Sequence, residues 1–212
     1  MVTDEQITQA SQHLNNLLVT QWVNQQFLSP TWFFLVITLI ISYALFIYLV
    51  DRERLIEILL FGSLVAVAFA NYDTIGQQFG YWAYYKSILP LNPNLFLGDI
   101  TLIPIYAMFV YQYTSSWRSF LIWNTVWAGL FSFVFYHIVL EYLKVFTYLK
   151  PFAVWLDFGL FLLFGIISRA IVIAFLKSEA NRGRTSSKLS LSMLMNQPSS
   201  KSSIGKIKGD VI

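Results

Sequence analysis

Thr31 to Val50 is a run of 20 residues without a charged side chain, TWFFLVITLIISYALFIYLV. An α-helix of this length rises about 30 Å, which matches the hydrocarbon core of a lipid bilayer. Polar residues precede the run, and it lacks the small-residue cleavage site of a secretory signal peptide. The run therefore predicts a membrane anchor that remains in the protein.

The composition points the same way, because hydrophobic residues make up 57% and charged residues only 12% of the 212 positions. A typical soluble domain is about 45–50% apolar and about 25% charged. So few charges cannot cover the surface of a soluble fold. The sequence contains no cysteine, which excludes a disulfide framework, an iron–sulfur cluster and a thiol nucleophile.

Four more apolar stretches follow, and the sequence predicts an all-α, polytopic membrane helix bundle over residues 31–176. The five expected transmembrane helices cover about residues 31–50, 55–75, 98–114, 120–140 and 152–176. The stretches do not alternate between apolar and polar residues as the strands of a membrane β-barrel do. Lipid also offers no hydrogen-bond partner to an open sheet edge, so helices are the expected form.

The basic residues in the connections predict the orientation of the bundle. With the N-terminus outside, the cytoplasmic connections and the C-terminal tail carry ten Lys and Arg residues, and the outer connections carry three. Short cytoplasmic connections are enriched in Lys and Arg. We therefore expect the N-terminus outside and the C-terminus in the cytoplasm.

Residues 1–30 are predicted to form an extracytoplasmic amphipathic helix before the first span. Thr3 followed by Gln6 is a capping-box pattern. Apolar residues then recur along one helical stripe: Ile7, Ala10, Leu14, Leu17, Leu18 and Trp22. The helix either lies in the membrane interface or binds a partner.

Residues 177–212 are basic and Ser-rich, and they contain no aromatic side chain. Such a segment buries too little apolar surface to order itself, so we expect a disordered cytoplasmic tail. Its charge either fixes the cytoplasmic end of the last span or binds anionic lipid or nucleic acid. Because positive-inside bias alone accounts for the pattern, we expect no nucleic-acid partner.

Ionisable residues at membrane depth are the candidate site residues, since charges in a bilayer are costly. The predicted topology places Asp73, Asp99, His137 and Glu141 at the outer ends of the second, third and fourth spans. Asp157 lies about one and a half turns below the outer surface on the fifth. Four carboxyl groups and one imidazole are thus expected at one depth, with His137 and Glu141 on one helix face.

This outer cluster has three interpretations. It binds a divalent cation through oxygen and imidazole ligands, it forms a polar vestibule for a small solute or proton, or its acids simply face headgroup water. Asp157 ranks first because it is the deepest. We expect Asp157, His137 and Glu141 to face the bundle interior. At its depth Asp157 must be protonated, paired or hydrated, and if it is paired, His137 is the expected cation.

Two further charges, Glu57 and Arg169, belong to the cytoplasmic half of the predicted bundle. Neither has another visible partner in the sequence, so we expect a structural ion pair between them. Alternatively, Arg169 lies close enough to the end of its span to snorkel towards the headgroups.

An enzymatic alternative rests on two short motifs on neighbouring spans. Tyr72-Asp73 and Leu97-Gly98-Asp99 resemble the YD and GxGD aspartates of intramembrane aspartyl proteases, in which two carboxyl groups activate water. Phe96 stands where that family has its first glycine, and both acids lie near the surface. The motifs of zinc proteases, α/β-hydrolases, P-loop proteins and dinucleotide-binding proteins do not occur, and we expect no cofactor.

The stretch from Trp82 to Arg169 contains WAYYKSILPLNPNLFLGDITLIPIYAMFVYQYTSSW and FYHIVLEYLKVFTYLKPFAVWLDFGL. It resembles a family of small multi-spanning membrane proteins of spore-forming Firmicutes that has no established biochemical role. The positions that match are Asp99, Pro104, Tyr111, Gln112, Glu141 and Trp155. The resemblance implies a bacterial cell membrane protein and supplies no catalytic residue.

These observations predict an integral membrane protein with a structural or accessory role, or one that handles small solutes or ions through the outer cluster. The alternatives are a transporter subunit and, less favoured, an aspartyl-type hydrolase that uses Asp73 and Asp99. The expected partners are the lipid bilayer and either a second copy of the chain or another membrane protein.

Overall fold

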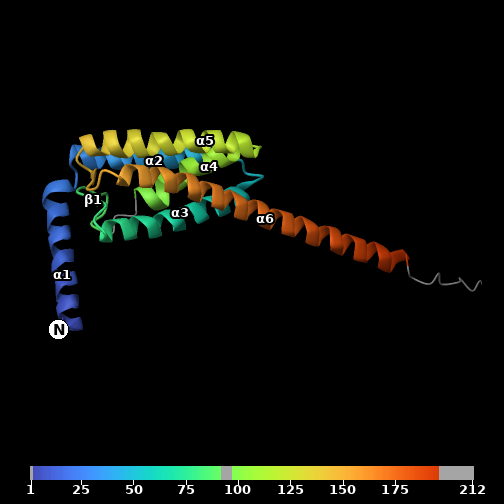
Figure 1. The fold of residues 1–212 in the computed structure, drawn as a ribbon, viewed down its shortest axis with the longest axis horizontal. Helices are drawn as coiled ribbons and strands as arrows, with labels where there is room; N and C mark the ends of the chain where they lie inside the picture. The colour runs from blue at the N-terminus through green and yellow to red at the C-terminus, as the bar shows by residue number, and fades with distance from the viewer. Residues whose placement is uncertain (1, 92–96, 196–212) are drawn as a thin grey trace, which may run out of the picture. The chain divides into compact units, whose positions relative to one another are not determined.

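The computed structural model describes residues 2–91 and 97–195, and this part of the chain is mostly helical (Figure 1). Four helices are long and apolar enough to cross a membrane: Pro30–Leu49, Leu55–Gln78, Trp117–Leu140 and Ala153–Asn181. The elements in chain order are α1 (Asp4–Gln21), η1 (Trp22–Gln26), α2 (Pro30–Leu49), α3 (Leu55–Gln78), β1 (Trp82–Tyr84), η2 (Gly98–Leu102), α4 (Ile103–Tyr113), α5 (Trp117–Gly129), η3 (Leu130–Leu140), β2 (Phe146–Tyr148) and α6 (Ala153–Met195), where η marks a π-helical segment.

The first helix begins at the capping box that the sequence predicts. The backbone N–H of Thr3 donates to the Gln6 side chain at 3.1 Å, and the N–H of Gln6 donates to Thr3 Oγ1 at 3.3 Å. No residue of α1 is buried. After η1, Ser29 caps α2 through the N–H of Trp32, and Pro30 occupies the first helical turn, where its missing donor is not needed.

One end of the bundle, here called the strand end, is closed by a small antiparallel sheet. Strands β1 and β2 pair so that Trp82 faces Tyr148 across the ladder. The segment after β1 reaches the start of α2, because the Trp32 indole donates to the carbonyl of Ile88 at 3.1 Å. Lys86 also donates to Thr31 Oγ1 at 3.1 Å.

The opposite end, here called the turn end, holds the connection from α2 to α3. Gln112, in the last turn of α4, donates to the carbonyl of Leu49 at 2.9 Å and accepts from the N–H of Asp51 at 3.0 Å. Arg54 donates to the carbonyl of Gln112 at 3.4 Å. The C-terminus of α4 therefore lies beside the α2–α3 connection.

The expected third span, residues 98–114, is not a single membrane-length helix. It consists of the five-residue segment η2 followed by the 11-residue helix α4. Eleven α-helical residues rise only about 17 Å, against about 30 Å of hydrocarbon. Pro104 sits in the first turn of α4, where a proline starts a helix more readily than it continues one. Four helices, and not five, are therefore long enough to span.

The disordered tail from residue 177 stays a prediction; in the described residues α6 continues as a helix as far as Met195. No proline interrupts the chain between Ala153 and Met195, and Lys, Leu, Met and Ala favour the helix. Residues 196–212 lie outside the described residues. A separate compact unit begins at Ile173, and every contact and cavity discussed below lies in the unit before it.

Gly76, near the end of α3, allows the closest approach between a helix and the small sheet. A Cβ atom at this position would lie 1.9 Å from the ring of Trp82, which is 3% exposed. The indole thus fills the space that a larger side chain at residue 76 would need. This contact fixes β1 against α3.

Gly76→Ala is therefore expected to lower the free energy of unfolding by about 1–3 kcal/mol, the usual cost of overpacking. Gly159→Ala is the matched control, because nothing lies within 4 Å of a Cβ there. Removing a glycine from a helix interior should leave that variant as stable as the parent or raise its stability by about 0.5–1 kcal/mol. Thermal unfolding in detergent measures both, and equal stability of the two variants would contradict the packing.

Candidate functional site

A small cavity lies between the helices close to the strand end, and it contains three of the predicted site residues. The volume that the centre of a water molecule can occupy in it is about 10 Å³, which is room for about one water molecule. The lining residues are Phe69, Tyr72, Asp73, Trp82, Tyr84, Asp99, Ile103, Tyr136, Phe146, Asp157 and Phe161. They come from α3, β1, η2, α4, η3, β2 and α6. We call this space the aspartate cavity.

Asp73 is 3% exposed and receives hydrogen bonds on both carboxylate oxygens. The Trp82 indole donates to Oδ1 at 2.8 Å, and the Tyr84 hydroxyl donates to the same oxygen at 3.0 Å. Gln77, one turn later on α3, donates to Oδ2. Alternate residues of β1 thus supply two of the three donors, because side chains two apart in a strand point to one face.

Asp157 is 6% exposed and receives a hydrogen bond from the other strand, where the Tyr148 hydroxyl donates to its Oδ2 at 2.6 Å. Burial raises the pKa of the Tyr148 hydroxyl above its ordinary value, and the neighbouring Asp157 raises it further. Burial also raises the pKa of Tyr84. Both phenols therefore keep their protons at neutral pH and act as donors to the aspartates.

Asp99 is 3% exposed, and its Oδ2 has no hydrogen-bond partner among the described residues. The same holds for the hydroxyl of Tyr72, which also lines the cavity. Gly98, the residue before Asp99, packs against Tyr136, whose hydroxyl would lie 2.2 Å from a Cβ at this position. The glycine allows η2 to approach η3 and places Asp99 at the cavity wall.

No Lys, Arg or His side chain lines the aspartate cavity in the part of the chain that the structure describes. Three carboxyl groups therefore share a small enclosed space without a protein cation. Buried charges are unfavourable unless they are paired, so bound protons or a bound cation must balance this site. Among the described residues, no group of three or more His, Cys, Asp or Glu side chains is placed to hold a metal ion.

The structure separates His137 and Glu141 from the three aspartates. His137 Nδ1 lies 2.8 Å from Glu141 Oε2, which confirms that the two share a helix face, but the His137 side chain is 51% exposed. The prediction that His137 faces the interior is therefore wrong, and the salt-bridge partner of His137 among the described residues is Glu141, not Asp157. The segment that carries His137, η3, is π-helical, and its last residues lead to the connection before β2.

The predicted ion pair between Glu57 and Arg169 is also absent from the salt bridges of the described residues. Arg54 forms the salt bridge with Glu57 instead, with Nη2 of Arg54 at 2.8 Å from Oε1 of Glu57, because the two residues lie three positions apart at the start of α3. This hydrogen bond to Glu57 raises the pKa of Arg54. Arg169 donates to the carbonyl oxygens of Thr114 and Ser115, each at 3.2 Å.

The strand residues that hold the aspartates were not predicted as site residues. Trp82, Tyr84 and Tyr148 occur in the sequence analysis only within longer stretches and are not among its candidate residues. The detectable signal is the alternation of aromatic residues at spacing two, as Trp82-Tyr84 and as Phe146-Tyr148, which is a strand pattern. No known protein family, curated protein or solved structure matches the chain.

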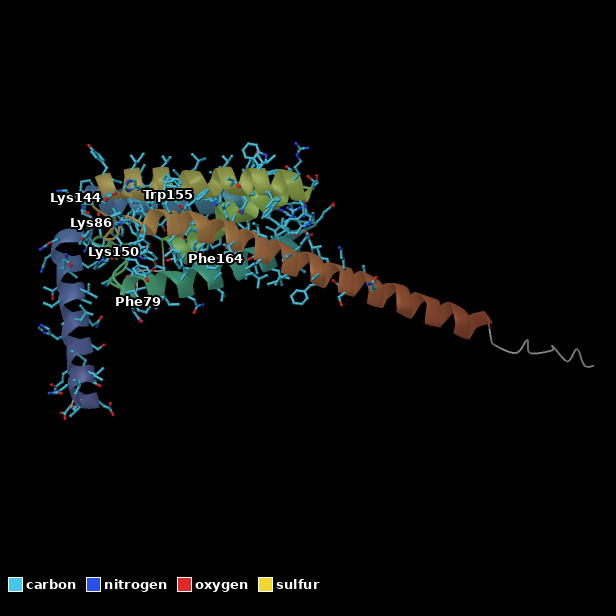
Figure 2. The ribbon with its side chains drawn as sticks, in the orientation of Figure 1. Phe79, Lys86, Lys144, Lys150, Trp155 and Phe164 are labelled. Carbon is cyan, nitrogen blue, oxygen red and sulfur yellow. The ribbon has the colours of Figure 1, made fainter. Side chains whose placement is uncertain are left out.

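Figure 2 shows Lys86, Lys144 and Lys150 at the strand end of the bundle. Lys86 and Lys144 line a separate and wider cavity of about 320 Å³ together with Glu141 and Thr147. The aspartate cavity thus lies beneath a surface that carries basic side chains.

Tyr148→Phe should lower the free energy of unfolding by about 1–3 kcal/mol at neutral pH, because the buried Asp157 carboxyl loses its donor. Tyr142→Phe is the matched control, since Tyr142 is 85% exposed and has no such role. Thermal unfolding in detergent measures the difference. Equal stability of the Tyr148→Phe variant and the parent would contradict the bond.

The pH dependence provides a second check on Tyr148. A group whose pKa is raised by folding stabilises the folded state below its unfolded value and loses this contribution as the pH rises. The stability advantage of the parent over Tyr148→Phe should therefore shrink above about pH 10, the usual pKa of tyrosine, by up to about 1.4 kcal/mol per pH unit. An advantage that grows with pH would contradict the assigned donor.

Proposed function

We propose that this chain is an integral membrane protein that handles small ions, binding and releasing them at the aspartate cavity. One observation carries the proposal: Asp73, Asp99 and Asp157, from three different helical segments, line one water-sized space that no basic side chain of the described residues shares. Ionisable groups buried in a membrane protein usually mark an ion or substrate path. The leading role is that of an accessory ion-binding protein, and a transporter subunit is the alternative.

The hydrogen bonds support a site that alternates between two charge states. Asp73 is held by three donors, which suit an ionised carboxylate, whereas Asp99 Oδ2 and the Tyr72 hydroxyl lack partners within the described residues. Buried polar atoms without a partner are uncommon in folded proteins. An added proton or ion would satisfy such atoms, so the cavity is suited to gain and lose one.

Contacts at the two ends of the bundle support five passes through the membrane, although only four helices have full length. Ile88 lies at the strand end and Gln112 at the turn end, so the chain between them runs from one end to the other. Counting this pass, the proposed topology has five crossings. The excess of basic residues then favours an outer N-terminus in a bacterial cell membrane.

The orientation can be tested by labelling, because the chain has no native cysteine. We expect a membrane-impermeant maleimide to label Asn15→Cys and Tyr142→Cys in intact cells. Glu53→Cys and Ser115→Cys, at the turn end, should react only after the membrane is permeabilised. All four positions are exposed in the structure, so access to the reagent is the variable. Labelling of the last two variants in intact cells would reverse the proposed orientation.

The exposed apolar residues of α1 support an interfacial helix on the outer surface, among them Ile7, Leu14 and Leu17. Membership of the family of small membrane proteins from spore-forming Firmicutes remains part of the proposal and rests on the sequence resemblance. A second copy of the chain or another membrane protein is the proposed partner for the transporter alternative, because five passes are few for a transporter acting alone.

An aspartyl hydrolase is a second candidate because Asp73 and Asp99 line the same cavity. The size of the space weighs against it, since room for about one water leaves none for a peptide bond and its flanking residues. Asp73 is also fully engaged by Trp82, Tyr84 and Gln77, whereas an aspartyl dyad shares its proton with water. Ion handling therefore fits the site better.

The proposal predicts that ions or protons stabilise the folded protein through Asp99. The unfolding midpoint of the parent in detergent should differ between about pH 5 and pH 8, or between NaCl, MgCl₂ and choline chloride of equal ionic strength. A ligand at 100 times its Kd would contribute about 2.7 kcal/mol, which corresponds to several degrees for a chain of this size.

Asp99→Asn should remove that dependence because it replaces the carboxyl group that lacks a partner and keeps the shape. Asp4→Asn is the control, since Asp4 lies exposed on α1. Identical profiles for the parent and Asp99→Asn under all these conditions would refute ion handling at the cavity.

A further inference from the structure

Two more cavities lie between the aspartate cavity and the strand-end surface. The outermost, of about 320 Å³, and the middle one, of about 60 Å³, share Gln21, Gln26, Tyr85 and Lys86 in their walls. Both are large enough for water. The two cavities are therefore neighbours, separated by shared side chains near η1 and β1.

Two side chains separate the middle cavity from the aspartates. Tyr84 lines both the middle cavity and the aspartate cavity, and its hydroxyl donates to Asp73 Oδ1 at 3.0 Å. Gln77 also lines the middle cavity and donates to Asp73 Oδ2. The partition is thus made of an O–H and an N–H group that both end on the same carboxylate.

This partition can pass a proton without opening. A hydronium ion in the middle cavity can give a proton to the Tyr84 oxygen while the phenolic O–H gives its own proton to Oδ1 of the ionised Asp73. One O–H bond forms and one breaks at Tyr84, hydronium becomes water, and the phenol is restored. A metal ion has no such route, because it would have to displace both side chains and shed its water.

Basic groups along the route also disfavour a metal cation. Lys86 lines both outer cavities, and its ammonium group donates to Thr31 Oγ1 at 3.1 Å and to the Leu143 carbonyl at 3.3 Å, among its contacts. Lys144 lines the outermost cavity. A divalent ion entering from this end would meet two ammonium groups and one carboxylate, Glu141, so the charged side chains that line the outermost cavity carry a net positive charge that repels it.

We infer that the ion exchanged at the aspartate cavity is the proton, which enters from the strand end through the two polar cavities and is relayed by Tyr84 to Asp73. The inference rests on the proposed function, and it narrows the ion class and assigns Tyr84 as a positioning and relay residue.

The groups that face the relay from the surrounding elements are themselves titratable. The aspartates face Tyr72 of α3, Tyr136 of η3 and Tyr148 of β2. Lys86 is a basic group on the outer side of the partition. Asp73 nevertheless remains the first acceptor on the route, because it alone among the three aspartates is bonded to Tyr84 in the described hydrogen bonds.

Rapid-mixing infrared spectroscopy on the full chain in nanodiscs tests the relay. After a pH jump, the carboxyl stretching band of the buried aspartates should relax in the parent, and Tyr84→Phe should slow that relaxation about tenfold or more, since one bridging hydroxyl is lost. Phenylalanine keeps the ring that packs against Phe146 at 5.0 Å between centroids. Tyr85→Phe is the control, because Tyr85 lines the outer cavities but gives no hydrogen bond to Asp73.

Gln77→Leu provides a second variant should Tyr84→Phe fail to fold, and it should accelerate the relaxation or leave it unchanged because the hydroxyl remains. An unchanged rate in a folded Tyr84→Phe variant would overturn the relay.

Loss of the carboxyl band in the parent on adding NaCl or MgCl₂ at constant pH would overturn the proton assignment but leave ion handling intact. A carboxyl region that responds to neither pH nor ions would overturn the proposed function itself.

Discussion

A carboxyl group buried among membrane helices must find its hydrogen-bond donors in the protein, because the surrounding lipid offers none. The helices themselves cannot supply them, since their backbone N–H groups are already engaged. The chain meets this requirement with two three-residue strands that fold over one end of the bundle. Trp82 and Tyr84 of β1 reach Asp73, and Tyr148 of β2 reaches Asp157. The pairing of the strands therefore sets the geometry of the site, and Gly76 makes room for it.

The same requirement, with the opposite charge, organises the turn end. Arg169 is 4% exposed and donates to the carbonyls of Thr114 and Ser115, where the end of α4 leaves acceptors without helical partners. The guanidinium also lies 4.5 Å from the ring centroid of Phe120, a cation–π distance. Glu57 is held nearby by Arg54 and by the Tyr111 hydroxyl, at 2.8 and 2.5 Å. The short α4 is thus anchored at its C-terminus by side chains of other elements.

Sequence reasoning succeeded where one physical term dominates. An uncharged run of membrane length predicted α2 to within one residue at each end, and the cost of buried charge singled out Asp73, Asp99 and Asp157. Its predictions were wrong or missing where no single physical contribution dominates. His137 was expected inside the bundle because charge at membrane depth is costly, yet its side chain is 51% exposed on η3. The strands were missed because three residues are too few for a clear alternation. Arg169 was expected to form an ion pair with Glu57 because only opposite charges were considered. In the structure the guanidinium group donates to the backbone carbonyls of Thr114 and Ser115 instead.

The distribution of polar space distinguishes between the two ion-handling roles. A transporter must expose its site alternately to both sides, which requires a polar route on each. In the residues that the structure describes, the cavities open from the aspartates towards the strand end. Towards the turn end, the core contains closely packed aromatic side chains, such as Phe61 stacked on Tyr111 at 4.5 Å and Phe69 against Phe161 at 4.3 Å. A proton that enters from the strand end therefore leaves by the same path. A site with one access path equilibrates with the compartment on that side, so this arrangement favours an accessory protein that responds to protons at the strand end over one that moves them across the membrane.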